Sequence, residues 1–571
     1  MVGVLVVVIG CVVVEVGLWM TDCGDGGQWL GGCWSLDVDH VEDVELMVDL
    51  GLNSYRFSIS WARILPKGRH GNINLAGIRF YDKLIDNLLE KGIQPFITLS
   101  HFDIPQDLED RYGGLLSNKF QVKYWVTFNE PNVNIHFGYR TGVYPPNRCS
   151  GSFGNCSKGD SEKEPFIAAH NVILAHAVAV KLYRTRYQEK QGGTIGIVLN
   201  TIWYEPISNS TSDKFAAERA QSFFMNWFLD PIMFGEYPAE MRKILGRNLP
   251  RFTKNEKKIL IKALDFIGVN HYTSFYAQDC IFSSCKLGGG VTWTEGLYLR
   301  TPLEQWHTHW RTIGAHYRPL LPPHFRSPSY RPQRSTAVSG WSDLIVVMVV
   351  GLVMAVRLVM GGSQGSRWMC RMMCGWGGYG VVMGRWWRVK GGSGWVVVVE
   401  GGSGQGGGGE LGLAVVLNNI TYTSFPQTAM DWLYIHPQGM EKIVTYLKKR
   451  YSNTPMFITE NGYAQESLQN SSINGLLNDS KRVEYMADYL DSLLRTIEKG
   501  ADVRGYFAWS LLDNFEWLWG YTRRFGLYYV DYDTLKRSPK LSVAWYREFI
   551  SKHRRQTVAN QRGNEIALQS S

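Results

Sequence analysis

Short β-prone segments alternate with longer helix-prone segments along most of this chain, and this alternation restricts its fold more than any other feature. The segment 52–60 reads Leu-Asn-Ser-Tyr-Arg-Phe-Ser-Ile-Ser and is followed by the amphipathic stretch 78–91. Gly92 ends that stretch, and a new β-prone segment begins at Ile93. Strands that alternate with helices in this way are typical of a parallel α/β architecture.

The same two patterns recur as far as residue 512. The β-prone segments are 52–60, 93–101, 122–130, 194–203, 265–270, 455–460 and 505–512. The helix-prone segments are 42–50, 78–91, 164–188, 215–229, 255–263, 437–451 and 480–498. Hydrophobic residues make up 45% of the chain and charged residues 19%, so the sequence can supply the large core that such a fold requires.

Two glutamates stand at the ends of β-prone segments. Glu130 precedes Pro131, which disfavours a helical backbone for the residue before it, so we expect Glu130 in extended backbone at a strand tip. Glu460 closes an apolar segment and is followed by Asn-Gly. A solvated strand end would explain either carboxylate alone. Two strand-tip carboxylates in one chain are the pair that a retaining glycosidase requires, one as acid/base and one as nucleophile.

The sequences around these glutamates resemble the two signatures of glycoside hydrolase family 1, the β-glucosidases and their relatives. The motifs are Thr-Phe-Asn-Glu-Pro at 127–131 and Ile-Thr-Glu-Asn-Gly at 458–462, and the surrounding sequence is most similar to the plant members. The resemblance implies an α/β fold of the (β/α)8 TIM-barrel type, with the active site at the C-terminal ends of the strands. It also implies double displacement, with Glu460 as nucleophile, Glu130 as acid/base and about 5–5.5 Å between their carboxyl groups.

Further positions match the sugar-binding residues of the family. The resemblance implies that substrate is bound by Arg56, His101, Asn129, Asn270, Tyr272, Trp432, Trp509, Glu516, Trp517 and Phe525. In this reading Arg56 keeps the nucleophile ionised, His101 binds the glycone, and Trp432 is the platform for the aglycone. From the residues alone, His101 would more often be a core histidine with its hydrogen bonds satisfied. An aromatic strand such as 506–509 would likewise more often be core than site.

The resemblance favours O-glucosides over related substrates. A thioglucosidase of this family typically has Gln where Glu130 stands, and a phospho-β-glycosidase would replace the pair Glu516-Trp517 with phosphate-binding groups. Transglycosylation uses the same residues and stays open. The stretch 100–106 and the loop 153–156 are similar to the group that acts on monolignol glucosides such as coniferin, so we expect phenolic or other plant β-glucosides as substrates.

Parts of the chain depart from the family pattern. Members normally open with a barrel strand that carries a sugar-binding Gln, which residues 1–36 do not resemble. A family helix is also missing near 117–121, where the chain runs straight into 122–130. We therefore expect an incomplete barrel that lacks its first strand and one helix. The alternative function is a catalytically impaired remnant that binds sugar or does not fold.

The expected organisation places two barrel parts around an insertion. The segments are an unmatched N-terminus (1–36), the first part of the barrel (37–302), a low-complexity insertion without regular structure between barrel strands 6 and 7 (303–424), the last part of the barrel (425–550) and a C-terminal tail (551–571). We interpret 1–36 and 303–424 as translated non-coding sequence or a faulty gene model. The apolar run 344–356 is too short for a confident membrane span, so no membrane association is expected.

Cysteines and glycosylation sequons give information on the cellular compartment of the protein. Cys149 and Cys156 flank a short loop that resembles the small disulfide loop of plant members, which implies that the two are bridged. Glycosylation sequons begin at Asn155, Asn209, Asn419 and Asn470. The resemblance implies a secretory route that ends outside the cell, in the cell wall or in the vacuole, and the sequons mildly favour it, although the apolar N-terminus lacks the preceding Lys or Arg of a signal peptide.

Charge and ligand spacing indicate the kind of partner. The formal net charge is +9, but the basic residues are scattered, so a mildly basic enzyme is favoured over a nucleic-acid-binding protein. Ligand-spaced His or Cys clusters are absent from the sequence outside the insertion, and we expect no metal or cofactor. The expected partner is a small-molecule β-glucoside, and the sequence leaves the oligomeric state open.

Overall fold

The computed structural model of the chain describes residues 39–68, 73–116, 127–151, 153–277, 279, 383–388, 395–400, 414–417, 425–467 and 471–554. The chain divides into two compact units, the first comprising 1–315 with 425–571 and the second 316–424. Most of the predicted insertion therefore falls in the second unit, and both expected parts of the barrel fall in the first.

Parallel strands form the centre of the first unit. One ladder joins β1 (Ser54–Ser58) to β2 (Gln94–Thr98), and a second joins β12 (Val503–Ala508), β10 (Met456–Asn461), β5 (Phe266–Asn270) and β3 (Gly196–Asn200) in that order. Asn129 links the two, because its N–H donates to the carbonyl of Ser100 at 2.9 Å and it forms a parallel bridge with Val198. These pairings build the wall of a TIM barrel, which confirms the predicted fold class.

Several predictions about missing parts of the barrel lie outside the described residues. No ladder joins β12 to β1 within the described ranges, and the segment expected to lack the first strand, 1–36, precedes those ranges. The expected deletion near 117–121 falls between Leu116 and Thr127, which are separated by residues that the structure does not describe. The incompleteness of the barrel therefore stays a prediction.

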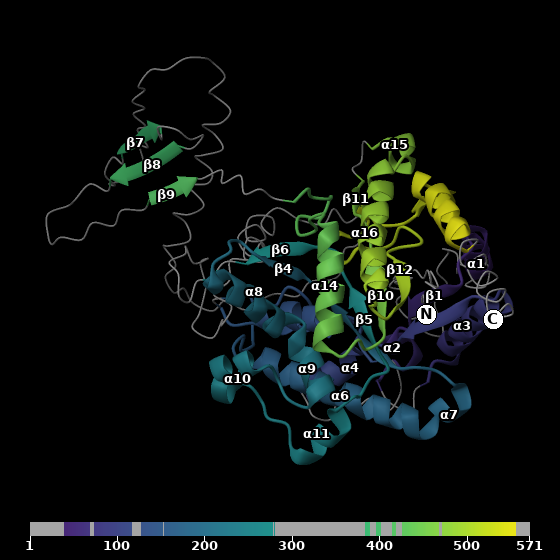
Figure 1. The fold of residues 1–571 in the computed structure, drawn as a ribbon, viewed down its shortest axis with the longest axis horizontal. Coiled ribbons are helices and arrows are strands. Elements are labelled where there is room, and N and C mark those ends of the chain that lie inside the picture. Colours follow the sequence, from purple (N-terminus) through teal and green to yellow (C-terminus); the bar gives the residue numbers. More distant parts are fainter. Residues whose placement is uncertain are drawn as a thin grey trace, which may run out of the picture. The chain divides into compact units, whose positions relative to one another are not determined.

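Helices follow the strands in sequence and lie around them (Figure 1). They are α1 (Asp39–Leu50), α2 (Trp61–Ile64), α3 (Leu75–Glu90), α4 (Gln106–Tyr112), α5 (Pro131–Ile135), α6 (Glu164–Arg186), α7 (Gln188–Gln191), α8 (Thr211–Phe224), α9 (Asn226–Phe234), α10 (Ala239–Leu245), α11 (Lys254–Leu260), α14 (Pro437–Arg450), α15 (Ile473–Leu477), α16 (Ser480–Glu498) and a helix over 541–554. Short strand pairs are β4 (Trp203–Pro206) with β6 (Ser274–Ala277), β11 (Gln465–Glu466) with β13 (Arg523–Arg524) and β14 (Tyr528–Val530) with β15 (Arg537–Pro539).

Local sequence explains where α3 begins, which face it buries and where it ends. The side-chain oxygen of Asn74 accepts hydrogen bonds from two backbone N–H groups of the first turn and so caps the helix. Its buried residues recur every three or four positions and are Gly77, Tyr81, Leu84 and Leu88. Gly92, with φ +71°, turns the chain away from the helix toward β2.

Four phenylalanines from different strands fill one region of the barrel interior. The rings of Phe96 and Phe266 lie 5.3 Å apart, and Phe96 is 5.4 Å from Phe457 and 5.0 Å from Phe507. Stacked layers of side chains make the interior of such a barrel a packed core rather than a pore. This region of the barrel interior is therefore apolar.

The second unit contains an antiparallel sheet that the sequence did not predict. β7 (Met383–Arg388) pairs with β8 (Trp395–Glu400), which pairs with β9 (Ala414–Leu417). We expected no regular structure over 303–424, and this prediction is wrong for the residues of these three strands. The reason is local, since 395–399 reads Trp-Val-Val-Val-Val and glycine-rich stretches stand on both sides of β8.

Cys149 and Cys156 form a disulfide, as predicted, with their Cα atoms 5.4 Å apart. The adjacent backbone requires Gly142, because a Cβ there would lie 2.0 Å from the sulfur of Cys156. A cross-link of so short a loop stabilises the fold by about 2–3 kcal/mol in the chain-entropy model.

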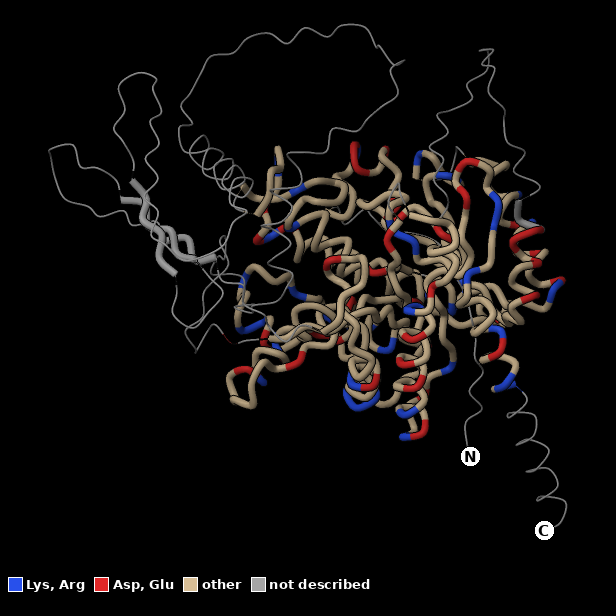
Figure 2. The backbone as a smooth tube through the Cα atoms, turned by 90° about the horizontal axis from the view of Figure 1, so that it is seen from above, with Lys and Arg blue, Asp and Glu red and all other residues tan. Residues whose placement is uncertain are grey.

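Helix α6 is long and apolar enough to span a membrane by length and composition, but more than half of its apolar window is buried within the protein. It is mostly a core helix of the first unit. Charged residues of both signs are interspersed over the described part of the chain, as Figure 2 shows. This distribution matches the scattered basic residues of the sequence.

Candidate active site

The polar residues of the predicted site gather at the C-terminal ends of the parallel strands. They are Arg56 in β1, His101 after β2, Asn129 and Glu130 beside β3, Asn270 and Tyr272 at the end of β5, Glu460 near the end of β10 and Trp509 after β12. Hydrogen bonds and ring contacts join these residues, although they come from distant parts of the sequence. This is the end of a TIM barrel where active sites are found.

Glu130 lies at a sharp turn between Asn129, which bridges to Val198, and α5, and its backbone differs from the predicted one. Its N–H donates to the carbonyl of Val198 at 2.9 Å, while its own carbonyl accepts from the N–H groups of Val133 and Asn134. We expected an extended backbone, but φ and ψ are +43° and +52°, in the left-handed region. Glu130 stands between the bridged Asn129 and the first residue of α5, so it alone must redirect the chain into the helix, and Pro131 is already suited to the first helical position. This conformation costs a non-glycine residue about 1–2 kcal/mol.

Glu460 is held by two donors. Arg56 Nη1 lies 2.7 Å from its Oε1, and the hydroxyl of Tyr272 donates to its Oε2 at 2.8 Å. Arg56 is fully buried, and its Nε and Nη2 donate to Thr98 Oγ1 at 3.2 Å and to Asn129 Oδ1 at 2.6 Å. A carboxylate can only accept hydrogen bonds, so this set of donors suits an ionised Glu460.

Glu130 has a different environment. Its Oε1 accepts from Asn270 Nδ2 and from Asn200 Nδ2, each at 2.9 Å. Burial, followed by the negative charge of Glu460, raises the pKa of Glu130 to about 8, although the two amides and Arg56 act in the opposite direction. Glu130 is therefore protonated at neutral pH. Two carboxyl groups with such different surroundings are the usual arrangement of an acid/base and a nucleophile.

A chain of amides fixes the groups around the two glutamates. Asn129 Oδ1 accepts from Arg56 and from Asn270, so its Nδ2 points to His101 Nε2 at 3.0 Å. Burial, followed by the charge of Arg56, lowers the pKa of His101 well below its usual value, which keeps the ring neutral. With Nε2 accepting, the ring proton is on Nδ1, which donates to the hydroxyl of Ser58 at 2.8 Å.

Aromatic rings flank this polar cluster. Tyr272 lies 5.8 Å from Trp432 and 6.2 Å from Phe525 between ring centroids. On another side, His101 lies 6.4 Å from Trp509 and 5.6 Å from Trp517. The structure therefore brings every predicted aromatic residue to the cluster.

Glu516 adds a third buried carboxyl group. Burial, followed by the charge of Glu460, raises its pKa to about 8, and its Oε2 has no hydrogen-bond partner within the described part of the chain. A buried acceptor without a partner suits a hydroxyl group supplied by a ligand.

Two residues of the cluster were not predicted from the sequence. Asn200 ends β3 and donates to Glu130. The ring of Tyr144 lies 6.0 Å from that of Phe102, which in turn lies 5.2 Å from the ring of Trp517. Burial, followed by the charges of Glu516 and Glu130, raises the pKa of Tyr144. Asn200 is a polar residue at the end of an apolar strand, which is the same pattern that predicted the two glutamates. This pattern could therefore have identified Asn200 from the sequence. Tyr144 follows no strand and carries no such signal.

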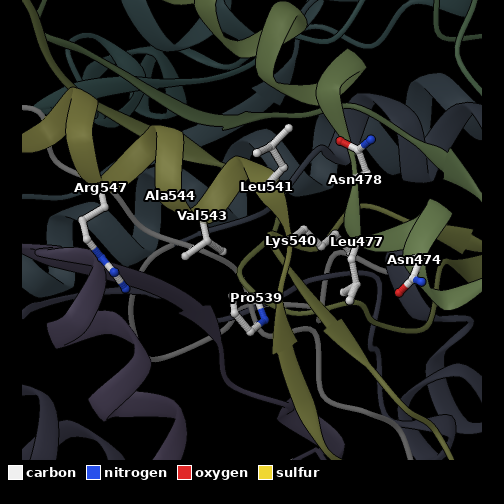
Figure 3. A pocket seen from close by; sticks show the side chains of 9 residues that line it. All are labelled: Asn474, Leu477, Asn478, Pro539, Lys540, Leu541, Val543, Ala544 and Arg547. Atoms are coloured by element: carbon white, nitrogen blue, oxygen red, sulfur yellow. The ribbon is translucent and has the colours of Figure 1, made fainter.

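Other parts of the described chain do not extend this site. A hollow of about 450 Å³ lies between residues 474–478 and 539–547, and none of the predicted sugar-binding residues lines it (Figure 3). Among the residues that the structure describes, no group of three His, Cys, Asp or Glu side chains could hold a metal ion.

Comparisons with known proteins identify the family of the chain. The model of glycosyl hydrolase family 1 matches residues 38–289 and 414–555. "Probable inactive beta-glucosidase 14" of Oryza sativa subsp. japonica is 42% identical, over 90% of this chain and 80% of that protein. Coniferin beta-glucosidase of Pinus contorta is 39% identical, over 90% of this chain and 81% of that protein.

A solved structure of a β-glucosidase is also similar to this chain. A mutant of the rice Os3BGlu6 beta-glucosidase, in a covalent complex with glucose, is 36% identical and has a TM-score of 0.63, with 89% of this chain and 86% of that chain covered. The family model covers more than half of the chain, and the relatives are matched over most of their length. The chain belongs to glycosyl hydrolase family 1, and its activity is that of a glycosyl hydrolase.

Proposed function

We propose that this protein is a retaining β-glucosidase that hydrolyses β-O-glucosides by double displacement. In the first step Glu460 attacks the anomeric carbon, the bond to the aglycone oxygen breaks, and Glu130 gives that oxygen its proton. In the second step Glu130 takes a proton from water, which attacks the anomeric carbon and releases Glu460. The observation that carries the proposal is the contrast between Glu460, which faces a guanidinium, and Glu130, whose pKa is raised to about 8.

The same contrast supports both steps of the reaction. While Glu460 is ionised, its charge helps to keep Glu130 protonated as an acid. Forming the ester with the sugar removes that charge, so the pKa of Glu130 falls and it can act as a base. The covalent glucose complex of the related rice enzyme supports an intermediate of this kind.

We further propose glucosides with phenolic aglycones as the substrate class. The indole ring of Trp432, next to Tyr272, offers a face on which a phenolic ring can stack. The similarity to a coniferin β-glucosidase supports the same class. Glu516 would accept a hydrogen bond from a sugar hydroxyl, since its Oε2 is buried without a partner among the described residues.

The test is to incubate the protein with 4-nitrophenyl β-D-glucoside and to follow the released sugar by proton NMR. Retention requires β-glucose to appear first, whereas α-glucose as the first product would overturn double displacement. Comparison with coniferin and with octyl β-glucoside tests the aglycone class. Absence of any hydrolysis by folded protein would support the impaired alternative, and glucosyl transfer to an added alcohol in place of hydrolysis would support a transglycosidase.

The pH profile of kcat/KM should fall on its alkaline side with a midpoint near pH 8. Glu130 must carry a proton in the first step, and its pKa in the free enzyme is raised to about 8. The protonated fraction is therefore nearly complete at pH 6 and decreases about tenfold per pH unit well above 8. A profile measured from pH 4 to 10 checks this. An alkaline midpoint below pH 6 would contradict the assigned environment of Glu130.

Replacing Gly462 with alanine should lower both stability and activity. A Cβ at this position would lie 1.9 Å from the carbonyl oxygen of Trp509, so the end of β10 and the segment after β12 must move apart. We expect a loss of about 1–3 kcal/mol in unfolding free energy and a fall of about 10²-fold in kcat/KM from displacement of Glu460. Gly151→Ala is the matched control, since a Cβ there meets nothing within 4 Å. Equal melting temperatures for the two variants would contradict this account.

A further inference from the structure

Asn200 is the last residue of β3, and its side chain contacts the proposed acid/base. Its Nδ2 donates to Glu130 Oε1 at 2.9 Å, and Asn270 Nδ2 donates to the same oxygen at 2.9 Å. We propose that Asn200 is a positioning residue that holds Oε1 as an acceptor, so that Glu130 carries its catalytic proton on Oε2. This inference rests on the proposed acid/base role of Glu130.

The strand and helix around Asn200 hold it in place. Asn200 is paired in register with Asn270 on the neighbouring strand β5, so the two amides start from adjacent strand ends. The backbone carbonyl of Asn200 also accepts from Asn132 Nδ2 at 2.9 Å, and Asn132 lies in α5, directly after Glu130. The strand end that carries the donor is thus tied to the helix that Glu130 caps.

The two amides do not have the same role. Asn270 Oδ1 accepts from Thr459 Oγ1 at 2.6 Å, which orients the amide, and its Nδ2 is shared between Glu130 and Asn129. The side chain of Asn200 donates to Glu130 and not to Asn129. Asn200 can therefore be replaced with less disturbance of the Asn129 network than Asn270.

Two N–H donors on one carboxyl oxygen determine where the proton sits. The carbonyl oxygen of a protonated carboxyl group is a better acceptor than its hydroxyl oxygen, so Oε1 takes the carbonyl role and Oε2 carries the hydrogen. When Glu130 is ionised in the second step, the same donors stabilise its charge. Asn200 therefore acts in both steps, since it orients the acid and lowers the pKa of Glu130.

Other charged and titratable groups also face Glu130. They are Glu460 on β10, Arg56 on β1, Glu516 after β12, and the hydroxyl groups of Tyr144 and Tyr272. Replacing Asn200 leaves all of these in the chain. A change in the titration of Glu130 in such a variant can then be assigned to the lost amide.

Asn200→Leu removes the donor and keeps a similar side-chain volume. A hydrogen bond to a charged acceptor is stronger than one to a neutral acceptor by about 1–1.5 kcal/mol, so the alkaline midpoint of kcat/KM should move up by about one pH unit. For phenyl β-glucoside, which needs an acid, kcat/KM should fall about tenfold or more at pH 6. For 2,4-dinitrophenyl β-glucoside, whose leaving group needs no proton, it should change by less than about threefold.

Two further variants separate positioning from a general defect. Asn226→Leu removes a buried amide in α9 that is bonded to Tyr446 and Tyr451 and contacts neither Asn200 nor Glu130, so it should lower the melting temperature without moving the alkaline midpoint. Asn200→Asp places a second carboxyl group against Oε1, and the like charges should move the midpoint up further than Asn200→Leu does. A merely structural role would lower activity toward both substrates equally and leave the pH profile unchanged.

A titration without turnover keeps this test independent of the proposed function. Infrared difference spectra between the wild-type chain and Glu130→Gln report the protonated carboxyl group of residue 130 as a function of pH. The same difference between Asn200→Leu and the double variant with Glu130→Gln should show a midpoint about one pH unit higher. Equal midpoints would overturn the role of Asn200 even in an active enzyme. A shifted midpoint in a chain that hydrolyses nothing would refute the proposed function while sustaining the hydrogen-bond role.

Discussion

Replacing Glu460 with glycine should abolish hydrolysis of β-glucosides, with a fall in kcat of about 10⁴-fold or more. No other carboxylate is held by both Arg56 and Tyr272 in the described part of the chain, so no neighbour can take over the attack. The variant should still join α-glucosyl fluoride to an acceptor alcohol. This fluoride has the configuration of the missing glycosyl-enzyme, and Glu130 can deprotonate the acceptor as the C–F bond breaks.

A second variant, Glu460→Gln, separates the loss of the nucleophile from the loss of stability. Glu460 is the anionic partner of the buried Arg56, so its removal leaves a guanidinium among neutral acceptors and lowers stability. Glu460→Gln keeps an acceptor of similar size and should be equally inactive toward 4-nitrophenyl β-glucoside, but it should melt at a higher temperature than Glu460→Gly. Ordinary turnover by either folded variant would assign the nucleophile to another residue.

The positions of the two glutamates could be predicted because each is closely followed by a residue that ends extended backbone, Pro131 in one case and Gly462 in the other. Gly462 is needed where the backbone passes close to Trp509, and Pro131 begins α5, so each motif has a local physical reason. The parallel strands could be predicted for a similar reason, since apolar β-branched runs alternate with helical periodicity. Structural features that depend on a few neighbouring residues can therefore be predicted from the sequence.

The hydrogen bonds and the electrostatics could not be derived in the same way. Arg56 and Glu460 are 404 residues apart, and Asn200 and Glu130 are 70 residues apart, so their contacts appear only when the barrel wall is assembled. The backbone of Glu130 was predicted wrongly because the rule for residues before proline ignores the need to pass from the bridged Asn129 into α5 at a single residue. Its raised pKa depends on burial, which no local pattern reports.

Glu130→Gln should separate the two steps of the reaction by their need for a proton. Glutamine has the same shape, and its carbonyl oxygen can accept from Asn200 and Asn270, so the fold and the amide network should survive. It cannot give up a proton to an aglycone. We expect kcat/KM for phenyl β-glucoside to fall by about 10²–10⁴-fold, the usual contribution of a general acid.

Substrates with very good leaving groups should behave differently in the same variant. The first step with 2,4-dinitrophenyl β-glucoside needs no acid and should stay close to the wild-type rate, whereas the second step lacks its base and should limit kcat. A burst of dinitrophenol followed by slow turnover is therefore expected in stopped-flow absorbance. Azide needs no base, so it should speed the slow phase and give β-glucosyl azide, because the second displacement restores the configuration. Equal losses for the two substrates, with no burst and no rescue by azide, would mean that residue 130 supports the fold of the site and is not its acid/base.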